Sequence, residues 1–511
     1  MIGTARWQLI FIRSCIVLLQ YFIPLSALFC VGLVISQPVR HRIPSLVVAW
    51  AVAETLFFLL VFLPRYFILQ QDAFHPPPLP RDERQRLFRR CFETVPDLEQ
   101  YLIGWFKGAP RSEIRRENVK EFFCWSFLNK RDYGLVDDQE LEDYTDQVEV
   151  ILGRSLPSGK GNAKPLRLTL DKVPMLHRPL IWYIVCVFTV DAIAHIYLRY
   201  RSFHFYRLPL SRFATVFPPR PLALLTTHIT PARTVSYWHR PHKSKSRLPV
   251  LFIHGIGIGL YTYAHFLAQL NRRKDNQGDG EIGIIAVEIM PISFRLTHAA
   301  LDSEEMKSEI LKIVLSHGWT KFVLVTHSYG SVIATHLLKD KKASSLVGPM
   351  LLIDPVSILL HLPDVAYNFT CRQPVEANEH QLYYFASMDM GVAHALSRRF
   401  FWQDNILWKA ELDGRRVTVV LAGRDLIVNT EAVGRYLAGN QDLASKEKDS
   451  SWKRREWKGT GLDIIWHDEL DHAQVFDTKA DYSQLVEVIR QYTKPLRSQL
   501  TDGERDVGGK T

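Results

Sequence analysis

The sequence predicts an α/β protein with a mainly parallel sheet, preceded by apolar helices at its N-terminus. From about residue 211 onward, short runs rich in Val, Ile and Leu alternate with helical patterns, which is typical of parallel strands joined by crossover helices. Before residue 70, two apolar runs are each long enough to cross a bilayer as a helix. The chain therefore divides into a membrane region, a connecting region and a larger α/β domain.

The membrane region covers residues 1–70, with predicted spans at about 15–35 and 43–63. Pro24 is tolerated in the first span. Glu54 lies in the second, where a charged carboxylate costs about 2.5 to 3.5 kcal/mol, so we expect it to be protonated or to face the first helix. A cleaved signal peptide would have a shorter apolar region than the first run and would end in a small-residue cleavage site, which this run does not show. We therefore favour a transmembrane helical hairpin.

Arginines set the expected orientation of this hairpin. Those that follow it, from Arg65 and again from Arg81, favour the cytosolic side, whereas Arg40 and Arg42 in the turn oppose this assignment. We expect an integral, multi-pass membrane protein whose main domain faces the cytosol. A third apolar run, residues 179–198, carries Asp191 and His195 and either spans the membrane or lies as an interfacial or core helix.

Composition excludes several classes of function. The net charge is +10, but no nucleic-acid-binding motif accompanies it, so attraction to an anionic membrane or ordinary solvated helix faces explain it better. The six cysteines show no disulfide or zinc spacing, and no metal or cofactor is expected.

Residues 71–210 are predicted to be a helical linker region, and residues 497–511 a disordered tail.

Three predicted strand ends in the region 211–496 carry the residues of interest. The first strand ends in His254-Gly255-Ile256-Gly257, where glycines let backbone N–H groups converge on one point. The segment "VLVTHSYGSVIATHLL" is a strand, a sharp turn and a helix, with Ser328 at the turn. A later strand ends in "AGRD" with Asp425, and "DHAQ" with His472 follows.

These motifs resemble those of the α/β-hydrolase superfamily over residues 211–496. The resemblance implies the α/β-hydrolase fold, with Ser328 as nucleophile, His472 as general base and Asp425 as the acid that orients it. It also implies that the backbone N–H groups of Ile256 and Tyr329 form the oxyanion hole. Together with the hairpin, the segments "HPPPLPRDER" and "SEIRRENVKEFF" are similar to predicted membrane-anchored fungal α/β hydrolases.

Alternatives remain open at each position. Thr326 replaces the first glycine of the usual elbow, and a serine in such a turn can be merely a helix N-cap. Asp354, at the end of "MLLID", is the alternate acid, and His467 is the alternate histidine. The polar group from His467 to His472 lacks the spacing of a metal motif and is expected to be solvated.

Residues 356–412 are too many for a simple crossover and are predicted to form a lid-like, apolar insertion, or additional core helices. Within it, Asn368 begins a glycosylation sequon that matters only if the domain is lumenal. The predicted function is a membrane-anchored serine hydrolase of ester or thioester bonds in a hydrophobic acyl substrate, with membrane lipids and that substrate as its partners. The alternatives are an inactive membrane-tethered binding or scaffold protein, or an acyltransferase.

Overall fold

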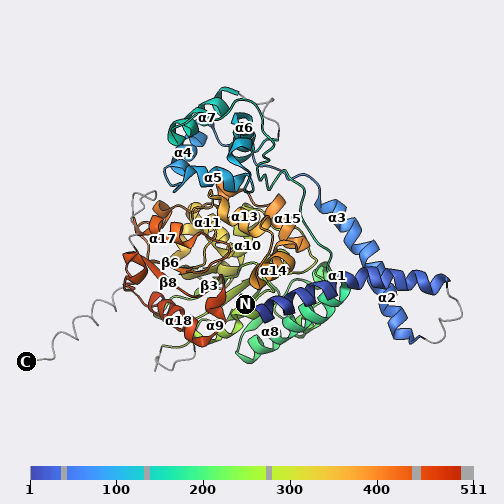
Figure 1. Cartoon of the computed structure of the whole chain (residues 1–511). Coiled ribbons are helices and arrows are strands. Elements are labelled where there is room, and N and C mark those ends of the chain that lie inside the picture. The colour runs from blue at the N-terminus through green and yellow to red at the C-terminus, as the bar shows by residue number, and fades with distance from the viewer. Residues whose placement is uncertain (1, 36–42, 132–137, 272–278, 440–449, 496–511) are drawn as a thin grey trace, which may run out of the picture.

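The computed structural model describes residues 2–35, 43–131, 138–271, 279–439 and 450–495 (Figure 1). The predicted tail at 497–511 and the arginines of the hairpin turn lie outside these residues. All structural statements below concern the described part of the chain.

An eight-stranded sheet forms the centre of the described chain, in the order β1-β2-β4-β3-β5-β6-β7-β8. β2 pairs antiparallel with both β1 and β4, and all other neighbouring pairs are parallel. The strands are His204–Tyr206 (β1), Ser236–Arg240 (β2), Val250–Ile253 (β3), Ile284–Glu288 (β4), Phe322–His327 (β5), Val347–Ile353 (β6), Val417–Ala422 (β7) and Leu462–His467 (β8). The sequence did not predict β1, so the sheet begins seven residues before the expected boundary at residue 211.

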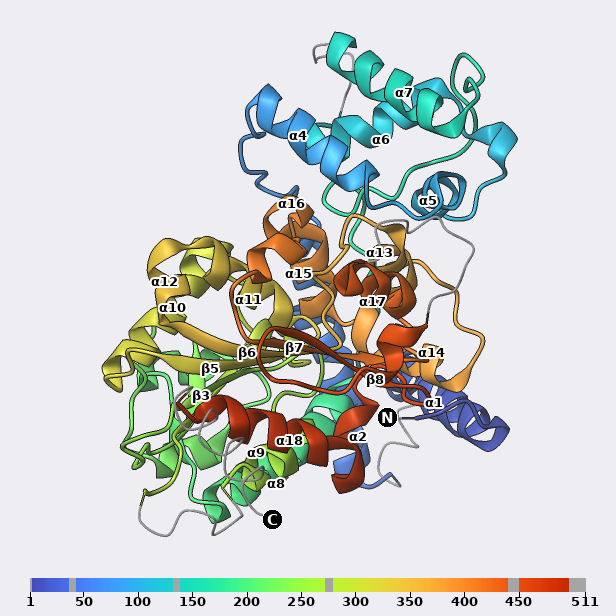
Figure 2. The same cartoon turned by 90° about the vertical axis from the view of Figure 1, so that its left-hand side faces the viewer.

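Helices cover both faces of the sheet, as the continuous burial of its central strands requires (Figure 2). One face carries Ala264–Gln269 (α9), Lys479–Thr493 (α18) and, near β1, Phe188–Tyr200 (α8). The other carries Ser303–Ser316 (α10), Gly330–Lys339 (α11), Lys341–Leu346 (α12) and Thr430–Ala438 (α17). Neighbouring strand residues alternate between the two cores: Leu324 faces the α11 side, and Val323 and Val325 face the α18 side.

The insertion between β6 and β7 is helical and lies above the strand ends that carry the site. Its elements are Pro363–Thr370 (α13), Ala377–Gln381 (α14), Leu382–Ser387 (η10), Met390–Arg398 (α15) and Trp402–Asn405 (α16). These helices bury Phe369, Val392 and Ala395 in the main core. The insertion is therefore both a cover over the site and a part of the core.

Residues 81–170, predicted as a linker, form a compact helical module (Figures 1 and 2). Its aromatic side chains pack together and belong to the same buried cluster as the α11 side of the sheet. Its helices are Arg81–Phe92 (α4), Leu98–Trp105 (α5), Arg116–Leu128 (α6) and Asp138–Leu152 (α7). The module is bonded to the insertion: Trp105 Nε1 donates to the carbonyl of His361 at 3.1 Å, and Trp402 Nε1 donates to the carbonyl of Ser126 at 2.8 Å. It is thus a docked roof and not a spacer.

Within the described residues, three helices are long and apolar enough to cross a membrane. They are Arg6–Ile35 (α1), Ser45–Leu69, which comprises α2 (Ser45–Phe57), η2 (Phe58–Phe62) and α3 (Leu63–Leu69), and Trp182–Tyr200, which comprises η5 (Trp182–Val187) and α8. α1 and α2 pack together, but Glu54 does not turn toward α1. Its carboxylate accepts the backbone N–H groups of Leu180 and Ile181 at 2.8 and 2.9 Å, just before η5.

The segment before β8 contributes to the core. Its Trp452 is fully buried and packs on α17. Gly434 makes room for this indole, because a Cβ there would lie 2.0 Å from the Trp452 ring. The described end of this segment is therefore part of the core.

Candidate active site

The turn after β5 holds Ser328 in a left-handed backbone conformation, with φ of +51°. This conformation is strained for a residue other than glycine. It is fixed by the N–H of Ser328, which donates to the carbonyl of Ile353 on β6 at 2.9 Å, and by the immediate start of α11 at Gly330. A Cβ on Gly330 would lie 2.5 Å from the carbonyl oxygen of Ile253, so the close approach of α11 to β3 requires glycine.

Thr326, two residues before the serine, remains a regular member of β5. It pairs with Ile253 on β3 and with Leu352 on β6, and its side chain is fully buried. Its Oγ1 atom has no hydrogen-bond partner in the described chain. A compact branched side chain therefore fits two residues before Ser328 without disturbing β5.

The structure brings Ser328, His472 and Asp425 together from three separate segments. Ser328 Oγ lies 2.9 Å from His472 Nε2, and His472 Nδ1 lies 2.7 Å from Asp425 Oδ2. Ser328 and His472 are buried and Asp425 is half-buried at the strand ends. This geometry allows the hydroxyl proton to pass to Nε2 while a carboxylate orients the ring through Nδ1–H.

Asp425 is held rigidly after β7. Its Oδ1 atom accepts the backbone N–H groups of Ile427 at 2.8 Å and Val428 at 2.9 Å, which leaves Oδ2 for the imidazole. The neighbouring loop is fixed by Asp471, whose Oδ1 accepts the N–H groups of Leu426 and His472. Both partners of the His472–Asp425 pair are therefore oriented by backbone hydrogen bonds.

The two alternate residues have different surroundings. Asp354, after β6, accepts the N–H of Ala473 at 2.9 Å and lies 3.7 Å from His327 Nε2, so it contacts the histidine loop but does not hydrogen-bond the His472 ring. His467 ends β8, and within the described residues its Nε2 atom has no hydrogen-bond partner. The hydrogen-bonded chain to Ser328 thus runs through Asp425 and His472.

Carboxylate and imidazole atoms of Asp354, Asp425 and His472 lie within 4.8 Å of one another, a donor set that a divalent cation could use. However, both nitrogens of His472 already make the hydrogen bonds described above. We therefore assign these residues no metal.

Charge determines the protonation of the histidine. Burial alone would lower the pKa of His472, but the negative charge of Asp425 and its hydrogen bond, together with the charge of Asp354, outweigh burial and raise that pKa to about 9. The adjacent His327 behaves in the opposite way, because burial lowers its pKa and leaves the ring neutral. Among the two buried histidines beside Ser328, only His472 is therefore stabilised as a cation.

The loop after β3 approaches the serine closely. A Cβ on Gly255 would lie 2.7 Å from Ser328 Cβ, so glycine is needed at this contact. The loop is anchored behind the site: the N–H of Gly255 donates to the Tyr263 hydroxyl at 3.3 Å, and this hydroxyl lies 2.8 Å from His327 Nδ1. In the described chain, the backbone N–H groups of Ile256 and Tyr329 donate to no protein acceptor, and both residues line the same pocket as Ser328.

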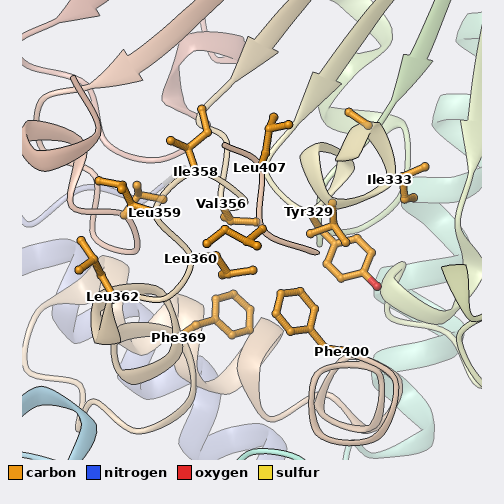
Figure 3. Close-up of a cluster of buried hydrophobic side chains, with 14 of the residues drawn as sticks. Tyr329, Ile333, Val356, Ile358, Leu359, Leu360, Leu362, Phe369, Phe400 and Leu407 are labelled. Atoms are coloured by element: carbon orange, nitrogen blue, oxygen red, sulfur yellow. The ribbon is translucent and has the colours of Figure 1, made fainter. Parts of the chain in front are cut away.

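Ser328 opens into an apolar pocket that lies between the sheet, the insertion and the helical module. Figure 3 shows Phe369 and Phe400 of the insertion beside Leu360 and Val356, with Tyr329 facing them. The module contributes Trp105, Trp125, Asn129, Leu168 and Thr169, and the remaining wall consists of Ile256, Val365, Ala366, Thr370, Leu396, Phe401, Trp402 and Ile427.

The module residues are those that sequence reasoning missed. α6 buries every residue from Asn118 to Leu128 except Glu121, whereas an amphipathic solvent-facing helix buries one stripe. The segment "EFFCWSFL" is apolar around most of its circumference, and this was the available signal that the helix packs on two sides.

Comparisons with known proteins give only remote similarities. No family model and no curated protein sequence matches the chain. Among solved structures, a membrane phospholipase A described as a bacterial virulence factor is 12% identical over 61% of this chain and 94% of its own, with a TM-score of 0.35. Two carboxylesterases of Bacillus subtilis, naproxen esterase and CesB, are each 11% identical. Naproxen esterase matches over 50% of this chain and 88% of its own, with a TM-score of 0.31. CesB matches over 60% of this chain and 98% of its own, with a TM-score of 0.33.

Scores this low carry no argument about activity, and the resemblance to fungal membrane-anchored hydrolases stays a prediction. The fold is assigned from the sheet itself, whose order has one antiparallel strand, β2, between β1 and β4 and parallel strands from β4 to β8. Ser328 follows the central strand β5 in a strained turn, and the insertion follows β6. The chain therefore has the α/β-hydrolase fold.

Proposed function

We propose that this protein is a membrane-anchored serine hydrolase that cleaves carboxylic ester or thioester bonds of a hydrophobic, lipid-like acyl substrate. The observation that carries the proposal is the hydrogen-bonded chain from Ser328 through His472 to Asp425, with its serine open to an apolar pocket. Neither a metal nor a cofactor has a role in the proposed reaction.

In this mechanism Ser328 Oγ attacks the carbonyl carbon while its proton passes to His472 Nε2. The resulting imidazolium is stabilised by Asp425 and then gives the proton to the leaving alcohol or thiol, which leaves an acyl-enzyme. Water attacks this acyl group in the second half-reaction, with His472 again accepting a proton, and Ser328 is regenerated.

The negative oxygen of the tetrahedral intermediate would bind to the N–H groups of Ile256 and Tyr329. Their freedom from protein acceptors supports this role, because such donors must be available at the moment of reaction. Removing one donor of an oxyanion hole typically costs about 10²- to 10³-fold in kcat.

The preference for a hydrophobic acyl group rests on the pocket wall. Most of its residues are aliphatic or aromatic, and the tryptophans of the module, Trp105 and Trp125, lie on the roof above the serine pocket. Each methylene group that leaves water for such a wall contributes about 0.8 kcal/mol, or about fourfold in binding. We therefore expect kcat/KM to increase with acyl chain length until the pocket is full.

The anchor is the helical hairpin formed by α1 and the helix Ser45–Leu69, both of which are apolar enough to span a membrane. Arginines after the hairpin support a cytosolic position for the catalytic domain. An apolar substrate partitioned into the bilayer would then be concentrated near the enzyme.

The test is labelling of the full-length protein in membranes with a fluorophosphonate probe, comparing wild type with Ser328→Ala. We expect the wild type to be labelled, and the variant to be unlabelled and to lose ester hydrolysis by about 10⁴-fold or more. Ser483→Ala is the control, since Ser483 is exposed on α18 and its hydroxyl donates to the carbonyl of Ala480 and not to a residue of the site. An unlabelled, correctly folded wild type would refute the hydrolase and favour a scaffold protein.

A second measurement tests whether the helical module forms part of the acyl-binding wall. Trp125→Ala should shift the substrate preference toward shorter acyl chains, with a larger loss of kcat/KM for long-chain p-nitrophenyl esters than for the acetate ester. An equal loss for all chain lengths would contradict the assignment of the module to the acyl-binding wall.

A further inference from the structure

The third apolar helix, Trp182–Tyr200, stays on the catalytic domain along its whole length. At its start, Tyr183 packs on Phe217 with 5.7 Å between the ring centroids. At its end, Leu198 is fully buried in the core that contains Trp238 of β2. A helix held at both ends by one domain cannot cross a bilayer unless that domain enters the bilayer with it.

Charged groups strengthen this attachment in the middle of the helix. Asp191 accepts from Arg220 Nε at 3.1 Å and lies 2.8 Å from Arg295 Nη2. Arg220 in turn makes a bidentate pair with Glu288 on β4. Moving the helix away from the domain would separate these buried charges, which is strongly unfavourable when one partner is left behind in an apolar medium.

The opposite face of the same helix is apolar and uncovered. Val185, Ile193, Ile196 and Tyr200 follow one another at helical spacing and are exposed, with Ile193 at 49% and Ile196 at 61%. An exposed apolar stripe along a whole helix requires a non-aqueous environment. The domain covers one face, and something other than water must cover the other.

Contacts with the hairpin indicate that the cover is lipid. Glu54 accepts the N–H groups of Leu180 and Ile181, so the helix begins beside the apolar length of α2. The Trp182 and Phe385 rings, the latter from η10, are in tilted contact with 5.0 Å between their centroids, and the adjacent Tyr384 packs with Ile12 and Ile16 of α1. The uncovered face therefore continues the apolar surface of the two hairpin helices.

The C-terminal end of the helix has the composition of a membrane–water boundary. Arg199 and Tyr200 are exposed there, and Arg201 follows. Aromatic and basic side chains at such an end favour the headgroup level and anionic lipids. This charge would be unfavourable for an apolar protein partner at the same place.

We propose that Trp182–Tyr200 is not a third span but a helix that lies in the plane of the membrane, with its stripe from Val185 to Tyr200 inserted at the boundary between headgroups and acyl chains. At 1.5 Å per residue it provides a contact about 28 Å long, and such helices insert by about 5 to 10 Å. The catalytic domain itself is then held flat against the bilayer. This proposal does not depend on the hydrolase activity.

The experiment measures the depth of nitroxide labels on the full-length protein in phosphatidylcholine–phosphatidylserine nanodiscs. Single cysteines replace Val185, Ile193 or Ile196 in a background whose four half-buried or membrane-region cysteines (Cys15, Cys30, Cys186, Cys371) are alanine. Val150→Cys on α7 is the control, because it is 80% exposed and lies on the module, far from α8 in both views. Thermal unfolding of each labelled variant checks that it is folded.

We expect collisions with oxygen to exceed those with a water-soluble nickel chelate severalfold at all three stripe positions, with a similar ratio along the helix, and the reverse at Val150. A ratio at the stripe that matches Val150 would mean that water or a protein covers the face, and would overturn the proposal. A ratio that peaks at Ile193 and falls toward both ends would mean a spanning helix, and would overturn it equally.

Discussion

Replacing Asp425 by asparagine tests how the site controls the tautomer of His472. In the structure, Oδ1 of Asp425 accepts two backbone N–H groups, at 2.8 and 2.9 Å, and Oδ2 lies 2.7 Å from His472 Nδ1. The asparagine has one oxygen left, and the two N–H groups require it. Its NH₂ group then faces Nδ1, so the ring proton must move to Nε2, where it points at Ser328 and blocks proton transfer.

The size of the effect follows from these contacts. Turning the amide over would leave two buried N–H groups without an acceptor, at about 1 to 3 kcal/mol each, so the unproductive orientation persists. An aspartate-to-asparagine change that imposes the wrong tautomer lowers kcat by about 10⁴-fold in a Ser-His-Asp triad. We expect a loss of this order for Asp425→Asn, with little change in KM.

Asp354→Asn is the matched control, because it removes the other nearby carboxylate. Its side chain accepts only the N–H of Ala473, at 2.9 Å, and an amide oxygen can accept this bond as well. We expect the rate on the high-pH plateau, where His472 is neutral in both proteins, to fall by at most about tenfold, corresponding to one weakened hydrogen bond.

Both variants would be compared with wild type in steady-state hydrolysis of a p-nitrophenyl ester, with thermal unfolding as the check on folding. A loss of about 10⁴-fold in Asp354→Asn and a small loss in Asp425→Asn would reverse the assignment of the acid. Small losses in both would refute the role of a carboxylate in orienting His472.

Three further predictions follow from the same contacts. Because the general base must be neutral and the pKa of His472 is raised to about 9, kcat/KM should increase with pH, with its midpoint near pH 9 and only about one-hundredth of the base active at pH 7. Asp354→Asn should move this midpoint to lower pH, and a flat profile from pH 6 to 9 would contradict the assignment. Gly330→Ala should destabilise the fold by about 1 to 3 kcal/mol and reduce ester hydrolysis at least tenfold, because its Cβ would lie 2.5 Å from the Ile253 carbonyl oxygen. Thermal unfolding and the hydrolysis rate measure these effects, and wild-type values of both would show that the turn adjusts. Asn368 should carry no glycan, since its Nδ2 donates to a backbone carbonyl at 3.0 Å and the domain is proposed to be cytosolic. A mass shift of the protein on glycosidase treatment would contradict the cytosolic orientation.

Local sequence signals predicted the elements whose chemistry is short-range. Buried parallel strands are continuous runs of Val, Ile and Leu, and β3 to β8 each overlap a segment where such a run predicted a strand. Two glycines of the predicted strand-end segments have no room for a side chain, because Gly255 lies against Ser328 and Gly330 lies against the carbonyl of Ile253. The three-residue strand β1 escaped detection because it is too short to show a pattern.

The sequence also left each pair of rivals open, because spacing along the chain does not say which side chains meet. Asp354 and Asp425 both follow strands, and both lie close to the histidine loop. Only the folded positions of β6, β7 and that loop distinguish a carboxylate bonded to Nδ1 from one bonded to the backbone of Ala473.

By itself, the sequence determined the class of fold, the two apolar helices of the hairpin and the strand ends at which the site lies, since these depend on periodicity and on glycine. The tertiary structure alone decided what packs on what. It turned residues 81–170 from an expected linker into the roof of the pocket, through Trp105 and Trp125. It also gave Glu54 a partner in the backbone before η5. Both contacts join residues far apart in the chain, and such contacts leave no local pattern from which they can be predicted.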